Sequence, residues 1–476
     1  MAGEEPDPRR WRALAVTQAA GFMSLLDVSI VNVALPSIQA GLGASPSAVQ
    51  WVISGYALTF GLSLVAGGRL GDALGRRRMF LVALTGFVLT SALAGAATSL
   101  WWLVAARLLQ GFTAGLLTPQ NTGLIQDLFR GAERGRAFGV FGATVGISTA
   151  VGPVLGGVIL ALFGDPGGWR WVFYVNLPIG LVALVLAARL LPKQRSEGRP
   201  DIDVVGAGLL GLTVLCLLFP LVQVDDIAYL WWLFPLAVAV GYGFVRWERR
   251  VVSRERAPLM DARLFTETPG YVAGATLGMA YFCGFTGMWL VFALYFQTGL
   301  GFSPLQSGLS VTPFALGSAV SAAVAGRLVE RLGRSLTVIG LCLVVVGLVA
   351  VALISLLVEG PSVAWWIAPA LLVAGVGGGA VISPNTTLTL SSVPTRMAGV
   401  AGGLLQTAQR IGQAVGTAVL STVFHAVLSR GGDFARATAT ALGTAVVLVC
   451  VALAIAVGDR RKQERRAPVG VGVTGS

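Results

Sequence analysis

The amino-acid sequence predicts an all-α polytopic membrane protein. Three observations support this prediction: an apolar composition, apolar segments that recur along the chain, and positive charge concentrated in alternate loops. Of the 476 residues, 55% are hydrophobic and only 12% are charged, with a mean hydropathy of +0.78. Soluble chains have about 25% charged residues. The composition therefore excludes a soluble enzyme, a disordered chain and a small disulfide-rich secreted protein.

Fourteen apolar segments follow one another, and crossing a bilayer takes about 20 apolar residues. An even number of crossings places both chain termini on one side of the membrane. The expected transmembrane helices cover residues 12–36, 48–68, 79–98, 100–123, 137–162, 169–191, 203–222, 229–246, 270–297, 306–327, 335–357, 363–389, 398–428 and 436–458.

Positive charge predicts the orientation, because cytoplasmic loops carry an excess of Lys and Arg. With both termini cytoplasmic, nearly all of the 34 Lys and Arg residues lie on the cytoplasmic side, and only Arg170, Arg430 and Arg436 lie outside. The net charge of +12 thus follows topology and does not indicate nucleic-acid binding. Arginine far outnumbers lysine, which is typical of GC-rich bacterial coding. We therefore expect a multi-pass protein of the bacterial cytoplasmic (inner) membrane.

An internal repeat divides these helices into two sets. The loop sequence GRLGDALGR begins at Gly68, and the related GRLVERLGR begins at Gly326. Repeated halves of this kind place a substrate site between them, near the bilayer midplane. The expected divisions are an N-terminal six-helix half (1–192), a linker with two inserted transmembrane helices (193–269), a C-terminal six-helix half (270–458) and a cytoplasmic tail (459–476).

Four motifs carry a family resemblance that covers nearly the whole chain. They are LDVSIVNVALP in the first span, GRLGDALGRRR after the second, ARLLQGFTAG in the fourth and VGPVLGG in the fifth. Together they resemble the major facilitator superfamily and, more narrowly, its fourteen-span drug:proton antiporters. The resemblance implies a major-facilitator fold of two six-helix halves plus two inserted helices. It also implies proton-coupled transport by alternating access.

Asp27 is the carboxylate that falls inside a predicted span. It lies about eight residues, or ~12 Å, from the external end of the first helix. A charge at such a depth costs roughly 2.5–3.5 kcal/mol on insertion scales, so the group should be protonated, paired or facing a cavity. Two interpretations follow: a neutral Asp that only fixes helix packing, or a proton-carrying group. The resemblance favours the second, with Asn32 as a polar neighbour in the cavity.

Arg107 enters the fourth span from the external side to a depth of ~10 Å, close to that of Asp27, so the two side chains could meet. In the family, the Arg of the R-x-x-Q-G motif, completed here by Gln110, is associated with proton transfer. An arginine does not itself release a proton, so we expect it to influence the charge of Asp27 and keep the cavity polar. A purely structural Arg is the alternative. Arg410 is a further intramembrane charge, either in the cavity or at a gate.

The fifth span contains glycines and a proline that weaken and kink ordinary helices and let neighbours approach closely. By resemblance this run is the antiporter motif, which is characteristic of exporters. A simple close-packing face is the alternative interpretation. The residues concerned are Gly152, Pro153, Gly156 and Gly157.

The loop that begins at Gly68 resembles a cytoplasmic latch that stabilises the outward-facing state. Gly75 permits a tight turn, and Asp72 can cap a helix N-terminus or pair with a neighbouring arginine such as Arg76. Glu330 occupies the Asp72 position in the second copy, so a weaker second latch is expected. The alternative is that the arginines only determine topology.

Substrate contacts are the least specific prediction. No phosphate-binding GxxxxGK[ST] loop and no His/Cys cluster occurs in the sequence, so neither ATP, a cofactor, a metal nor enzymatic chemistry is indicated. We expect a monomeric exporter that exchanges small hydrophobic or amphipathic drugs for protons. An exporter of an endogenous lipid or secondary metabolite and a non-transporting sensor are the alternatives. Side chains that could face the cavity are Gln120, Asn121, Asn385, Tyr56, Tyr281, Trp289, Phe292, Tyr295 and Phe296.

Overall fold

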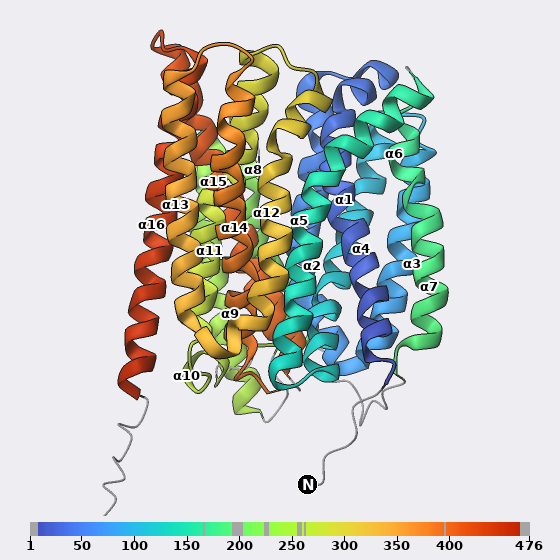
Figure 1. Cartoon of the computed structure of the whole chain (residues 1–476). Helices are drawn as coiled ribbons and strands as arrows, with labels where there is room; N and C mark the ends of the chain where they lie inside the picture. The colour runs from blue at the N-terminus through green and yellow to red at the C-terminus, as the bar shows by residue number, and fades with distance from the viewer. Residues whose placement is uncertain are drawn as a thin grey trace, which may run out of the picture.

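The computed structural model describes residues 8–164, 167–192, 203–222, 228–254, 259–260, 263–394 and 397–466. The chain forms a bundle of long helices that run up and down alongside one another (Figure 1). Helix α1 begins and helix α16 ends at the same end of the bundle, the lower end in Figure 1. We call this end the termini face and the other end the opposite face.

The first part of the chain is helical where the hydropathy pattern predicts it. Apolar side chains fill two clusters among these helices, one of which surrounds Phe80 and Phe87 and the other Trp169 and Phe173. The elements are α1 (Arg10–Leu42), α2 (Pro46–Leu74), α3 (Arg76–Gly95), α4 (Leu100–Leu128), α5 (Gly131–Phe163), α6 (Arg170–Tyr174) and α7 (Asn176–Leu190).

The middle of the chain contributes two further helices, and both lie against helices of the main bundle. Leu58 of α2 packs with Val214 and Leu218 of α8, and Val65 of α2 packs with Phe244 of α9. The elements are α8 (Val204–Val222), a 3-10 turn η1 (Ala228–Trp232), α9 (Leu233–Ser253) and the short α10 (Arg263–Thr266).

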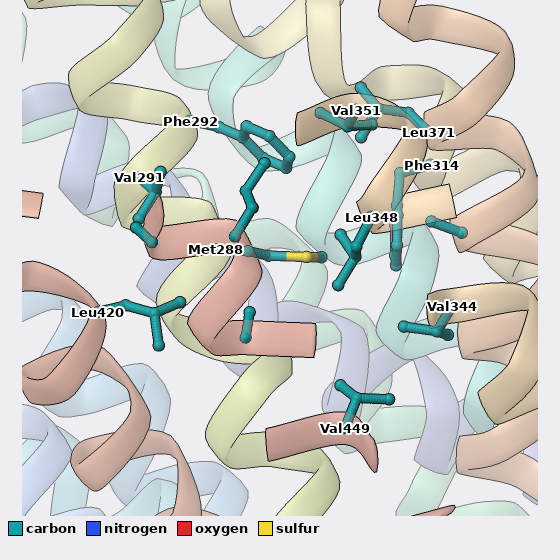
Figure 2. Close-up of a cluster of buried hydrophobic side chains, with 14 of the residues drawn as sticks. Met288, Val291, Phe292, Phe314, Val344, Leu348, Val351, Leu371, Leu420 and Val449 are labelled. Atoms are coloured by element: carbon teal, nitrogen blue, oxygen red, sulfur yellow. The ribbon is translucent and has the colours of Figure 1, made fainter. Parts of the chain in front are cut away.

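The last part repeats the pattern of long helices around an apolar core. Figure 2 shows Met288 and Phe292 of one helix meeting Leu348 and Leu371, which come from two others, in this core. The elements are α11 (Tyr271–Ala293), η2 (Leu294–Gly299), α12 (Pro304–Leu332), α13 (Arg334–Leu357), α14 (Val363–Leu390), α15 (Ala398–Ser429) and α16 (Phe434–Arg466).

Within the described residues, 12 helical segments are long and apolar enough to cross a membrane. Helices α5 and α8 contribute shorter apolar stretches, Val154–Phe163 and Val205–Leu221. The predicted all-α membrane fold is therefore confirmed with twelve candidate spans. The count of fourteen and the boundaries of the two halves stay predictions.

Candidate functional site

A buried ion pair lies at the centre of the first helical set. Asp27 of α1 and Arg107 of α4 are both fully buried, and Arg107 Nη1 lies 2.5 Å from Asp27 Oδ2. The structure thus brings together the two charges that their similar depth predicted would meet. Because the two charges lie side by side in the buried interior, each one compensates the other.

Two amides complete the shell of the carboxylate. Gln110 Nε2 donates to Asp27 Oδ1 at 3.1 Å, and Asn176 Nδ2 donates to the same oxygen at 3.0 Å. Asn176 also donates to Ser91 Oγ at 3.1 Å, which joins α7 and α3 to the site. Asp27 therefore accepts from three side chains, which replace the hydrogen bonds that water would give to an exposed carboxylate. Asn176 was not among the predicted residues, although it is the one Asn in the predicted span 169–191.

Arg107 is positioned by a second set of contacts. Its Nε donates to the Val52 carbonyl at 3.0 Å, and its guanidinium lies 4.2 Å from the centre of the Tyr56 ring. Tyr56 in turn donates to the Ser24 carbonyl at 3.3 Å. Tyr56, predicted as a substrate aromatic, is therefore buried and packs against the guanidinium group of Arg107. Further along α1, Asn32 is exposed, so it does not belong to this buried cluster.

At the termini face, α2 closes against the start of α15. Asp72 accepts from the backbone N–H groups of Gly399 and Val400, each at 3.1 Å. These amides belong to the first turn of α15, where the helix dipole favours a negative charge. Arg76 holds the carboxylate from its own side, at 3.0 Å from Asp72, and also pairs with Asp127 at 2.7 Å. Asp72 thus both caps a helix and pairs with an arginine.

Glycines make this closure possible. A Cβ on Gly68 would lie 2.2 Å from the Gly399 carbonyl oxygen, far inside van der Waals contact. Gly75, which separates α2 from α3, has a φ of 93°. Residues other than glycine rarely adopt this backbone conformation. Of the predicted latch residues, Gly68 and Asp72 therefore lie at the contact between α2 and α15, with Arg76 beside them and Gly75 in the turn that follows α2.

A related contact joins α5 to α12. A Cβ on Gly326 would lie 2.7 Å from the Gly139 Cα and 2.5 Å from the Gly135 carbonyl oxygen. Glu330 reaches toward the start of α5, where its Oε1 lies 3.5 Å from the Cβ position of Gly131. Among the described residues, Glu330 accepts no hydrogen bond, and the weaker second latch stays a prediction.

The glycines of the predicted antiporter motif face two neighbours. A Cβ on Gly152 would lie 2.2 Å from Ser29 Cβ of α1, and one on Gly156 would lie 3.1 Å from Ile30. One on Gly157 would lie 3.6 Å from Leu305 of α12, an ordinary contact. Pro153 lies inside the continuous helix α5. This stretch of α5 therefore packs closely on α1 while facing α12.

Two predicted cavity amides instead join helices. Asn385 donates to the Gly274 carbonyl at 3.0 Å and accepts from Arg334 at 2.7 Å, while Arg334 also pairs with Asp459 at 2.8 Å. Gln120 donates to the Gly67 carbonyl at 2.7 Å. Both amides are buried, so the prediction that they face a cavity is wrong for this conformation: tertiary packing gives them backbone partners.

Asn121 is buried against α1, where its Nδ2 lies 2.7 Å from the Cβ position of Gly21. This close packing again corrects the expectation of a cavity-facing amide. Sequence position alone does not separate the face of a helix that lines a cavity from the face that packs on a neighbour.

The predicted aromatics divide into two groups. Phe292, Tyr295 and Phe296 belong to the apolar core of the second part, and Figure 2 shows Phe292 within it, which corrects their assignment to a cavity. Trp289 lines a small space of ≈ 10 Å³ between α5, α11, α12 and α14. Tyr281 lies near this space, 5.3 Å from the Phe285 ring, and its buried hydroxyl has no partner among the described residues.

Arg410 of α15 faces α2. Its guanidinium lies 4.2 Å from the centre of the Phe60 ring, and its Nη1 donates to Gln413 at 2.9 Å. Within the described ranges it has no acidic partner, unlike Arg107 and Arg334. Arg410 is therefore an intramembrane cation for which the described part of the chain supplies no counter-charge in this conformation.

Sequence comparison places the chain among known transporters. A family model described as Major Facilitator Superfamily matches residues 19–417. A probable actinorhodin transporter of Streptomyces coelicolor is 40% identical over 433 residues, which cover 90% of this chain and 74% of that protein. The puromycin resistance protein pur8 of Streptomyces alboniger is 38% identical, with 89% of this chain and 83% of that protein covered. The tetracenomycin C resistance and export protein of Streptomyces glaucescens is 34% identical, with coverages of 89% and 77%.

Solved structures show the same fold at low sequence identity. The human organic anion transporter MFSD10 has a TM-score of 0.70 at 16% identity, with 94% of this chain and 100% of that chain covered. The proton:xylose symporter XylE has a TM-score of 0.66 at 14% identity, with coverages of 94% and 95%.

Proposed function

The chain belongs to the major facilitator superfamily, and we propose that it exports hydrophobic or amphipathic compounds in exchange for protons by alternating access. As a member it is a membrane transporter of small molecules and not an enzyme. Its relatives are named for antibiotic export or resistance, which supports a drug exporter. We place it in the bacterial cytoplasmic membrane as a monomer, with both termini cytoplasmic.

The observation that carries proton coupling is the buried Asp27–Arg107 pair. A proton arriving on the carboxylate of Asp27 removes its charge and so ends its ion pair with Arg107. Gln110 and Asn176 then donate to an uncharged carboxyl group, and this change favours a different arrangement of the helices α1, α4 and α7. Release of the proton restores the pair, so the charge of one residue biases the packing of three helices.

Closure of the termini face supports alternating access. The Asp72 contacts with α15 and the glycine contacts between α5 and α12 hold this face shut. Exporters must open that face to load substrate, so these contacts must break in each cycle. We infer the division into halves 1–192 and 270–458 with the linker 193–269, and fourteen crossings in which α5 and α8 both span the bilayer.

The charge balance of the membrane region bears on the substrate. Asp27 is neutralised by Arg107, whereas Arg410 has no acidic partner in the described part of the chain. An uncompensated cation between the helices favours neutral or anionic substrates over cationic ones. A second candidate, export of an endogenous secondary metabolite, is favoured by the relatives named for actinorhodin and tetracenomycin C export.

The test is transport into everted membrane vesicles that contain the chain, compared with vesicles that lack it. Neutral and anionic lipophilic dyes and actinorhodin serve as test substrates, and an imposed pH gradient is the only energy source. We expect accumulation that stops when a proton-exchanging ionophore collapses the gradient. Accumulation that persists without the gradient would exclude proton coupling, and transport of actinorhodin but not of the dyes would favour the metabolite exporter.

A further inference from the structure

A groove lies on the lateral surface of the helix bundle, where α5 and α12 cross. It has a volume of ≈ 440 Å³ and is lined by Trp11 of α1, Arg136 and Val140 of α5, and Ala323 and Arg327 of α12. All five side chains are exposed, so none of them is needed to fill the interior of the bundle. The groove therefore faces the surroundings of the protein, where lipid contacts a membrane-spanning bundle.

The positions of the two arginines follow from the glycine contact beneath them. Gly135 and Gly326 touch across the crossing, and Arg136 and Arg327 are the next residues in their chains. Both arginines therefore start from the point where α5 and α12 come closest. Each lies about five residues, or ~7.5 Å, from the termini-face end of its helix, which is the depth of lipid headgroups.

Neither arginine has an ion pair among the described residues. The nearest carboxylate along α5, Glu133, is engaged by Arg10 at 2.8 and 3.1 Å, and this hydrogen bonding holds the pKa of Glu133 below its usual value. Glu330, one turn beyond Arg327 on α12, has no salt bridge in the described ranges. Arg136 is close enough to Glu133 to contribute to the lowering of its pKa, but it forms no ion pair with it. The groove thus combines two guanidinium groups that have no ion pair within the described ranges with an apolar wall of Val140, Ala323 and Trp11.

We propose that this groove binds an anionic phospholipid, with the phosphodiester between Arg136 and Arg327 and the acyl chains along Val140, Ala323 and the outer wall of the bundle. Guanidinium groups bind phosphate through paired hydrogen bonds. Basic pockets between transmembrane helices at headgroup depth are suited to anionic lipids. Tryptophan adds an aromatic ring at the membrane interface, where it is favoured.

The bound lipid would act on transport by joining α5 and α12. Its phosphodiester carries a single negative charge, which would reduce the repulsion between the two like charges brought together at the crossing and so stabilise the closed termini face. This consequence rests on the proposed alternating access, whereas the binding site itself does not. Binding and transport are therefore measured separately.

The binding experiment uses the purified full chain in a neutral detergent. Phosphatidylglycerol with brominated acyl chains is titrated in, and quenching of tryptophan fluorescence reports bromine close to Trp11. The quenching that is lost in the Trp11→Phe variant is the part that comes from Trp11. Brominated phosphatidylcholine and unlabelled inorganic phosphate are the comparison ligand and the competitor.

We expect phosphatidylglycerol to quench Trp11 at concentrations at least tenfold lower than phosphatidylcholine, and Arg136→Gln with Arg327→Gln to remove this preference. The paired Lys substitutions should retain most of the preference and report correct folding. Arg249→Gln with Arg250→Gln, which removes two exposed arginines of α9, is the matched control and should bind as the parent does.

Three outcomes would overturn the proposal. They are equal quenching by both lipids in the parent, an unchanged preference in the double Gln variant, and displacement of the lipid by millimolar inorganic phosphate. The last would identify a free-anion site. In proteoliposomes, substrate transport that shows no dependence on phosphatidylglycerol would refute the effect on closure while leaving lipid binding and the proposed export as separate results.

Discussion

At the scale of the residue, the site depends on which side chains donate hydrogen bonds to the buried carboxylate of Asp27 in place of water. Its carboxylate accepts from Arg107, Gln110 and Asn176, and Arg107 in turn donates to the Val52 carbonyl. A buried ion pair adds little net stability, but removing one member leaves a charge that nothing compensates. The two residues should therefore behave as one unit in mutagenesis.

We expect Arg107→Ala to destabilise the protein by about 3–5 kcal/mol, because it leaves Asp27 charged and buried. Asp27→Asn combined with Arg107→Gln should recover most of that loss, since both charges are then absent. The measurement is a double-mutant cycle on thermal unfolding of the purified protein in detergent. Additive losses in the cycle would show that the two side chains do not act as a pair.

Asn176→Leu should lower gradient-driven transport several-fold, because it removes one donor to Asp27 worth about 1–3 kcal/mol. Ser91→Ala, which removes only the hydroxyl that Asn176 also contacts, is the matched control and should have a smaller effect. Initial transport rates in proteoliposomes distinguish them. If the Leu variant transports as fast as the parent, Asn176 plays no part in the coupling.

The pairing of Asp27 with Arg107 could be predicted from the sequence, because helix rise converts position into depth and a charge inside a membrane needs a partner. The role of Asn176 could not be predicted. An amide inside a span contacts lipid, a backbone carbonyl or a carboxylate according to the rotation of its helix, and only tertiary packing sets that rotation. The same reason explains why Gln120 and Asn385 pack between helices.

At the scale of the element, the termini face is closed by α2 against α15 and by α5 against α12. Each contact is made where glycines let backbones touch, and a carboxylate on α2 adds charge to the first turn of α15. The repeated loop sequences predicted a related pair of contacts. They did not predict which helix each loop would meet, because that depends on how the two helical sets are placed against each other.

Gly68→Val should hold the termini face open, because the new side chain would overlap the Gly399 carbonyl. Spin labels at Arg130, directly before α5, and at Arg331, near the end of α12, report the separation of these two helices on the same face. If the α2–α15 contact holds the whole face shut, that separation should lengthen while transport falls at least about tenfold. Gly443→Val, at a helical glycine with open space beside it, is the control. An unchanged distance distribution in the Gly68 variant would refute the role of this contact.

At the scale of the whole molecule, periodicity and charge predicted the membrane fold, the shared side of the termini and the order of helices along the chain. Local hydropathy measures how apolar a segment is, not whether it crosses the bilayer. The α8–α9 pair illustrates the difference, since these helices pack on α2 through Leu58 and Val65. Their crossing is therefore the part of the topology that most needs a direct test.

Single cysteines at Trp231 and Ser253, the two ends of the α9 region, test the fourteen crossings in a background without the four native cysteines. A membrane-impermeant thiol reagent should label position 231 in intact cells and position 253 only after the membrane is opened. Labelling of both from the same side would show that α9 does not cross.

The central claim is that Asp27 couples protons to export. The most direct measurement compares the parent and Asp27→Asn in proteoliposomes under two conditions: substrate exchange without a pH gradient, and uphill accumulation driven by one. The account predicts that the variant exchanges substrate at a rate near that of the parent but loses gradient-driven accumulation. Equal uphill accumulation by both proteins would contradict the claim, and loss of exchange as well would make Asp27 part of the substrate site instead.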